Sequence, residues 1–250
     1  MKSIFCLFLF LSIINAQVNI EGIRDNNLDG STLSIAFDTD FEKSNQEDFE
    51  FLSSIRYDHL FDNKATLLTI LDNEYEYRKD SESKDIVENK GLFHIRYVYP
   101  LERLSIESFG QIEFDDFRSI LRRDILGFGI RYNKETRLLD SLFYGVGFMH
   151  EFEKYDVTPY IEKKLIKSTN YITLSKQINS NIYLGSTSYV QTNISDIDQY
   201  RILNISEISV KISERIDINF NIDFRYEAKP VIDDIEDMYT NFSIGIVILI

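Results

Sequence analysis

Apolar and polar residues alternate along most of the chain, and the alternation is most regular between Arg215 and Glu227, RIDINFNIDFRYE. Every second residue of that stretch is apolar, and those between are polar or charged. A period of two residues is typical of a β-strand whose two faces meet different surroundings. From about Ser31 onward nearly every segment shows this period, and none shows a convincing helical stripe. The pattern predicts an all-β chain.

The segments number about twelve, with roughly 10 to 14 residues each, which is longer than the usual strand of about 5 to 6 residues. A strand that crosses a bilayer at a tilt needs about 9 to 11 residues. Tight turns at DNK, PLER, NSN and SER alternate with connectors that tend to be longer and more acidic, and NKETRLL is the exception. External loops of roughly 5 to 11 residues on one side, with both termini on the short-turn, periplasmic side, are expected of an outer-membrane barrel.

Alternation alone does not decide which face points inward, because a soluble β-barrel or sandwich gives the same pattern. About twelve strands with an apolar interior would leave a hollow, whereas an apolar outer face can contact lipid and a closed barrel satisfies every backbone group. We therefore predict a closed antiparallel transmembrane β-barrel of about 12 strands over residues 31–250. The lumen-lining candidates are Glu107, Gln111, Glu113, Arg131, Asp217, Asn219, Asn221, Asp223, Arg225 and Glu227. The lipid-facing candidates are Ile216, Ile218, Phe220, Ile222, Phe224, Phe242, Ile244, Ile246 and Ile248. Aromatic girdles are expected at Phe41, Tyr97, Tyr99, Tyr132, Phe152 and Tyr226.

The first residues differ from the rest. Lys2 precedes an apolar run from Ile4 to Ile14, and Ala16 lies just beyond it, which is the layout of a secretory signal peptide. The alternative is a buried N-terminal strand. We predict a signal peptide at 1–16 and a short periplasmic segment at 17–30. Cys6 is the only cysteine, so cleavage would leave a chain without disulfides or a thiol nucleophile.

Composition narrows the choice of partners. The chain has 250 residues, and 41 Asp and Glu against 27 Lys and Arg give a net charge of −14. A polyphosphate would be repelled at long range, so no nucleic-acid partner is expected. No linker-like stretch divides the chain, which predicts one domain after the signal peptide.

Three stretches resemble the salt-induced outer-membrane protein family, a bacterial family of unknown function. They are DGSTLSIAFD, then GFGIRYNKETR followed by FYGVGFMHEF, and finally ISERIDINFNIDFRYEAKPVIDDIEDMYTNFSIGIVILI. The resemblance covers most of Asp29 to Ile250, and its motifs are moderately specific. It implies a Gram-negative outer-membrane barrel and supplies no catalytic residue. One departure is the final Ile250, where barrel assembly usually reads an aromatic residue.

Few residues are candidates for metal binding or catalysis. His59, His94 and His150 lie on different predicted strands without metal-site spacing, so no metal site is predicted. Ser186 and Ser188 flank no nucleophile signature. The acidic pairs Asp115/Asp116 and Asp233/Asp234 fall in predicted external loops, where hard cations bridging to lipopolysaccharide could bind. We predict no catalytic residue, no cofactor and no enzyme.

Two kinds of function stay open from the sequence. The first is passive passage of ions or small solutes, or an envelope role under osmotic stress, and an acidic lumen would favour cations. The second is a barrel enzyme acting on lipid or lipopolysaccharide. A soluble periplasmic β-barrel is the architectural alternative. The expected partners are outer-membrane lipid, lipopolysaccharide, the barrel-assembly machinery, and cations in the lumen or acidic loops.

Overall fold

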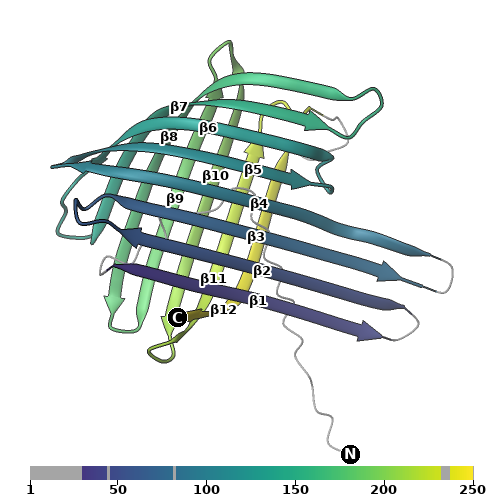
Figure 1. The fold of residues 1–250 in the computed structure, drawn as a ribbon, viewed down its shortest axis with the longest axis horizontal. Coiled ribbons are helices and arrows are strands. Elements are labelled where there is room, and N and C mark those ends of the chain that lie inside the picture. The colour runs from purple at the N-terminus through teal and green to yellow at the C-terminus, as the bar shows by residue number, and fades with distance from the viewer. Residues whose placement is uncertain (1–29, 44–45, 81–82, 232–236, 250) are drawn as a thin grey trace, which may run out of the picture.

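Twelve antiparallel strands form one closed barrel in the computed structural model of the chain, which describes residues 30–43, 46–80, 83–231 and 237–249 (Figure 1). The strands are β1 (Ser31–Lys43), β2 (Glu47–Leu60), β3 (Thr66–Lys79), β4 (Lys84–Leu101), β5 (Leu104–Asp115), β6 (Ile120–Asn133), β7 (Ser141–Tyr155), β8 (Ile161–Asn179), β9 (Ile182–Asn193), β10 (Asp196–Lys211), β11 (Ile216–Glu227) and β12 (Met238–Leu249). Within the described ranges no helix is long and apolar enough to cross a bilayer. The predicted fold class and strand number are confirmed. The predicted signal peptide and nearly all of the predicted periplasmic segment lie outside the described residues.

Each strand pairs with the next one along the chain, and β1 pairs with β12 to close the ring. Figure 1 shows β1 to β4 in front of β9 to β12, with the strands of the two walls crossing in this view. The closing pair differs from the others. Among the described residues its register contains only Ser34 with Leu249 and Ile35 with Ile248, whereas the β1–β2 ladder runs from Ser31 with His59 to Lys43 with Glu47. The wall therefore has its shortest run of paired residues between β1 and β12.

Polar side chains predominate inside the barrel and apolar side chains cover the outside. Among the described residues, 29 buried side chains are polar or charged and 15 are hydrophobic. On the outer wall, Leu126 is 70% exposed and Phe128 is 66% exposed. Hydrocarbon accepts such an apolar belt, and ring closure pairs backbone groups that lipid cannot satisfy. This is the arrangement of a membrane-spanning barrel and the reverse of a soluble one.

Eight strands have the predicted 10 to 14 residues, and four are longer: β4, β7, β8 and β10. The strands span 12 to 19 residues, with β8 the longest. The ladders continue past the apolar belt into polar residues, because backbone pairing does not depend on which side chains face lipid. Two external loops are shorter than the predicted 5 to 11 residues: 80–83 joins β3 to β4, and 194–195 joins β9 to β10. The predicted range of loop lengths is therefore wrong.

The longest connection, 228–237, is held at its start by a contact with a neighbouring hairpin. Lys229 Nζ donates a hydrogen bond of 3.0 Å to Asp196 Oδ2, at the start of β10. This hydrogen bond raises the pKa of the exposed Lys229 ammonium. The contact joins the β11–β12 loop to the β9–β10 hairpin at one end of the barrel.

The aromatic residues expected in girdles lie near strand ends. Tyr97, Tyr99 and Tyr132 are exposed and lie late in β4 and β6, at the end of the barrel where β1 begins. Phe41, also exposed, lies at the opposite end, together with Phe152 and Tyr226. Two levels of aromatic side chains are consistent with two headgroup regions.

Candidate functional site

The lumen-lining candidates lie on the inward face of β5, β6 and β11. Seven of them are buried: Glu107, Gln111, Glu113, Arg131, Asn219, Asp223 and Arg225. Asp217, Asn221 and Glu227 are half-buried. In β11, where the sequence alternation is cleanest, every polar residue from Asp217 to Glu227 belongs to this inward set.

The lipid-facing candidates lie on the opposite face of β11 and β12. Ile216, Phe220, Ile222, Phe242 and Ile246 are exposed, with Phe242 at 66%. Ile218, Phe224 and Ile244 are half-buried. The Ile248 side chain lies outside the described residues. The two faces therefore differ in both polarity and exposure.

A network of buried ion pairs fills the interior beside β5 to β8 and β10. Its centre is Glu151 of β7, which is fully buried and contacts Arg123, Lys167 and Arg201. Arg123 Nη1 also lies 2.7 Å from Glu113 Oε1. A buried charge is costly unless it is paired and hydrogen-bonded, so these partners are needed to keep the carboxylate inside the barrel.

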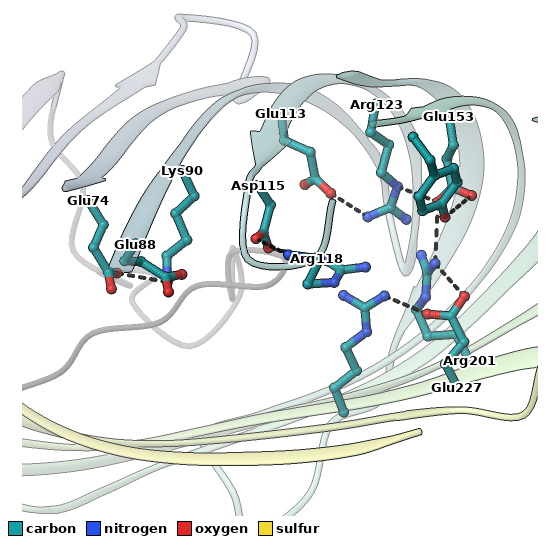
Figure 2. A network of polar contacts seen from close by, with 12 residues as sticks. Glu74, Glu88, Lys90, Glu113, Asp115, Arg118, Arg123, Glu153, Arg201 and Glu227 are labelled. Carbon is teal, nitrogen blue, oxygen red and sulfur yellow. Dashed lines mark hydrogen bonds and ion pairs between the residues drawn. The ribbon is translucent and has the colours of Figure 1, made fainter. Parts of the chain in front are cut away.

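The same network continues to β11. Arg201 Nη2 lies 3.3 Å from Glu153 Oε1 and 2.9 Å from Glu227 Oε1, and Arg225 Nη2 lies 2.6 Å from Glu227 Oε2. Figure 2 shows Arg123, Glu153, Arg201 and Glu227 gathered in the interior. Arg123 and Arg201 are each 1% exposed. Ion-paired side chains therefore block this side of the interior, which narrows any path through the lumen.

A second cluster surrounds Glu107 of β5. Arg96 Nη2 donates to Glu107 Oε2 at 2.6 Å, Arg131 Nε lies 3.2 Å from Oε1, and the Tyr171 hydroxyl donates at 2.7 Å to Oε2. Gly145 makes this cluster possible, because a Cβ at that position would collide with the Tyr171 ring. The sequence places glycines within β7, and the structure shows that Gly145 leaves room for the Tyr171 ring.

A cavity of about 280 Å³ occupies the other side of the interior, between β1 to β5 and β10 to β12. Among the described residues, seven carboxylates line it, against three cations. The carboxylates are Asp72, Glu74, Glu113, Asp115, Glu207, Asp217 and Asp223, and the cations are Arg56, Lys90 and Arg118. Some of these charges are paired: Lys90 Nζ lies 2.8 Å from Glu74 Oε2, and Arg118 lies 3.6 Å from Asp115 (Figure 2).

Other oxygens in the cavity lack a hydrogen-bond donor among the described residues. Asp217 Oδ1, Asn219 Oδ1 and Asp223 Oδ1 are buried and accept no hydrogen bond within the described residues. Asn219 is 6% exposed and Asp223 is 7% exposed. A buried acceptor without a donor is unfavourable, and a carboxylate more so than an amide. The cavity is therefore suited to a group that carries positive charge or donates hydrogen bonds.

The histidines do not converge on a metal site. His94 is buried, with Nδ1 3.1 Å from Gln111 Oε1, while His59 lies at the end of β2 and His150 points outward from β7. Across the described residues no group of three His, Cys, Asp or Glu could hold a metal ion.

The serines and acidic pairs considered in the sequence have structural partners where they are described. Ser186 and Ser188 lie on the outer wall, where Ser186 Oγ is 2.8 Å from Ser206 Oγ and Asn204 Nδ2 donates to Ser188 at 2.8 Å. Asp116 accepts a hydrogen bond of 2.7 Å from Asn89. Asp233 and Asp234 lie outside the described residues.

The fold and its interior together define a class: a twelve-stranded antiparallel barrel with an apolar outer wall and a charged lumen. The family model described as "Protein of unknown function, DUF481" matches residues 45–248, and the chain belongs to this family. No curated protein sequence matches the chain.

Solved structures share the fold. A porin, NanC, is similar over 88% of this chain and 98% of its own, at 10% sequence identity and a TM-score of 0.51. The translocator domain of the autotransporter NalP from Neisseria meningitidis is similar over 90% of this chain and 89% of its own, at 9% identity and a TM-score of 0.50. At such low identity the likeness shows the barrel fold alone.

Proposed function

We propose that this chain is an outer-membrane barrel through which small cations pass along the β1 to β4 and β10 to β12 side of the interior. The observation that carries the proposal is the excess of carboxylates over cations in the lining of the 280 Å³ cavity. Rings of Asp and Glu favour cations in pores. Because ion pairs block the other side of the interior, the path is narrow and its conductance small.

The outer-membrane location is part of the proposal. It is supported by the apolar outer wall, by the aromatic side chains at two levels, and by the barrel fold shared with the NanC porin. The proposed partners are therefore membrane lipid and lipopolysaccharide around the wall, and the barrel-assembly machinery during insertion. The family resemblance adds a proposed role in the envelope under osmotic stress, where a cation path would act.

The proposal assigns the barrel no catalytic role. The sharpest enzyme alternative is a Ser-His-acid arrangement of the kind that hydrolyses lipids. Ser186 and Ser188 have Asn204 and Ser206 as their hydrogen-bond partners, and these side chains offer no general base. Cation passage therefore has the stronger support.

Conductance of the purified protein in planar bilayers tests the proposal. Under a KCl gradient we expect small, stable current steps whose reversal potential lies toward that of K⁺. Asp223→Lys should move the reversal potential toward that of Cl⁻, because it reverses a charge in the cavity lining. Asp62→Lys makes the same charge change on the exposed β2–β3 turn and should leave selectivity near that of the wild type.

Two results would contradict cation passage. One is anion-selective current in the wild-type protein. The other is the absence of current from protein whose folding has been verified by heat-modifiable gel mobility. Silence accompanied by lipid hydrolysis would instead favour the enzyme alternative.

A further inference from the structure

We propose that the cavity binds amphiphilic cations, with the charged head inside the barrel and the hydrocarbon chain passing between β1 and β12 into the bilayer. The inference rests on the proposed membrane location. It goes beyond ion passage because it adds a ligand class and a lateral route through the wall.

The first support is the short seam between β1 and β12. Its pairing stops after Ser34 with Leu249 and Ile35 with Ile248. If the ladder continued, Phe37 would lie opposite Ile246, but no pair forms over Ala36–Lys43 within the described residues. At membrane depth, unpaired backbone is tolerated where it lines a polar or water-filled space. The cavity supplies such a space directly behind this opening.

The second support is that the cavity reaches both faces of the wall at the seam. Its lining includes Phe37 of β1 and Ile246 of β12, whose side chains are 65% and 59% exposed. By register these two residues share the outward face, since Phe37 pairs with Ser53 and Ile246 with Ile218. Interior residues line the same cavity, so it extends from the lumen to the lipid side.

The third support is the division of the interior lining into an apolar patch and a polar one. Leu52, Ile70 and Leu92 form the apolar patch on β2 to β4. On β11, Asn219 and Asp223 present buried oxygens that accept no hydrogen bond from the described residues. An ammonium head beside Asp223 can donate to its buried oxygen, or neutralise it, while its first methylene groups contact the apolar patch.

Charge selects the sign of the head group. Glu207, Asp217 and Asp223 all belong to the lining, in which carboxylates outnumber cations among the described residues. An anionic head would meet this field unfavourably and would leave the buried oxygens unpaired. A bare divalent metal is also a poor fit, because the described residues provide no set of three ligating side chains.

Volume selects the shape of the ligand. The cavity of about 280 Å³ lies just below the roughly 300 to 1,000 Å³ typical of sites that enclose a whole small molecule. It therefore accommodates a head group and the first part of a chain, but not a long-chain amphiphile. The rest of the chain would lie in the opening between Phe37 and Ile246, in contact with lipid.

A spin-labelled hexadecyl-ammonium probe in zwitterionic vesicles containing the protein tests the inference. We expect a motionally restricted spectral component that is much weaker for a spin-labelled fatty acid of similar length. Unlabelled hexadecyltrimethylammonium should displace the probe, and tetramethylammonium should not. Asp223→Asn should weaken binding by about tenfold or more, since it removes a buried charge partner. Asp62→Asn, the same substitution on an exposed turn, should not.

A second variant tests the lateral route. Ala36→Phe places a large side chain on the inward face at the seam and should reduce binding of the long-chain probe, even where Asp223 is intact. Gel mobility shows whether each variant is folded.

Several results would overturn the inference. Equal restriction of the cationic and anionic probes would remove the charge selection, and unchanged binding by folded Asp223→Asn would remove the assigned site. Displacement by tetramethylammonium as effective as by the long-chain cation would show a site for water-soluble cations alone. That last result would leave cation conductance intact, whereas absent conductance with normal probe binding would contradict only the proposed function.

Discussion

Glu151→Gln is expected to destabilise the folded barrel by about 3 to 5 kcal/mol, the cost of removing one member of a buried ion-pair network. Glu151 is fully buried and contacts Arg123, Lys167 and Arg201. Glutamine keeps the shape of the side chain but leaves these three cations with less compensating charge. Urea unfolding of the protein in vesicles, followed by far-UV circular dichroism, measures the loss.

Glu162→Gln is the matched control. Glu162 lies at the start of β8, and its side chain is 54% exposed. Its Oε1 lies 3.7 Å from Lys154 Nζ of β7. Exposed pairs of this kind contribute about 0 to 1 kcal/mol. Equal losses in the two variants would mean that the interior is wet enough to screen Glu151, and the account of a densely paired interior would be wrong.

Phe220→Lys is expected to destabilise the barrel by about 2 to 4 kcal/mol, because it places a charge on the lipid face near the middle of a strand. Asn219→Lys, one residue earlier, places the same charge among carboxylates of the lumen and should cost much less. A lysine is therefore expected to be costly at Phe220 and much less costly at the adjacent Asn219. Unfolding of the two variants in vesicles gives the comparison, and a larger loss for Asn219→Lys would contradict the proposed orientation.

The sequence predicts the strands and their faces because both depend on local alternation. A period of two in β11 places Phe220 and Asn219 on opposite faces whatever the rest of the barrel does. The length and aromatic content of the strands then favour lipid over water for the apolar face. The number of strands follows from counting the same local pattern.

The ion-pair network cannot be predicted from local alternation, although alternation does show which face some of its members lie on. Glu151 and Glu153 lie opposite in parity to Phe148, which marks them as inward. The pattern does not show which residues they pair with: Arg201 is on β10, three strands away from β7. Long side chains meet across the lumen according to barrel shear and closure, and neither is encoded in any one strand.

The seam between β1 and β12 shows a second limit. Both strands alternate, so the sequence predicts that they exist. The extent of their pairing depends on where the first and last strands of the ring meet after the others have set the curvature. The cavity depends on that meeting point, and the sequence contains no local sign of it.

The most direct test of the central claim is a scan of lipid and water accessibility along Ile216–Glu227. Single cysteines in a Cys6→Ser background would carry a spin label in vesicles, exposed in turn to oxygen and to a water-soluble nickel complex. We expect a period of two residues, with high oxygen accessibility at Phe220 and Ile222 and low values at Asn219 and Asp223. The opposite phase, or no alternation, would contradict a barrel whose apolar face contacts lipid.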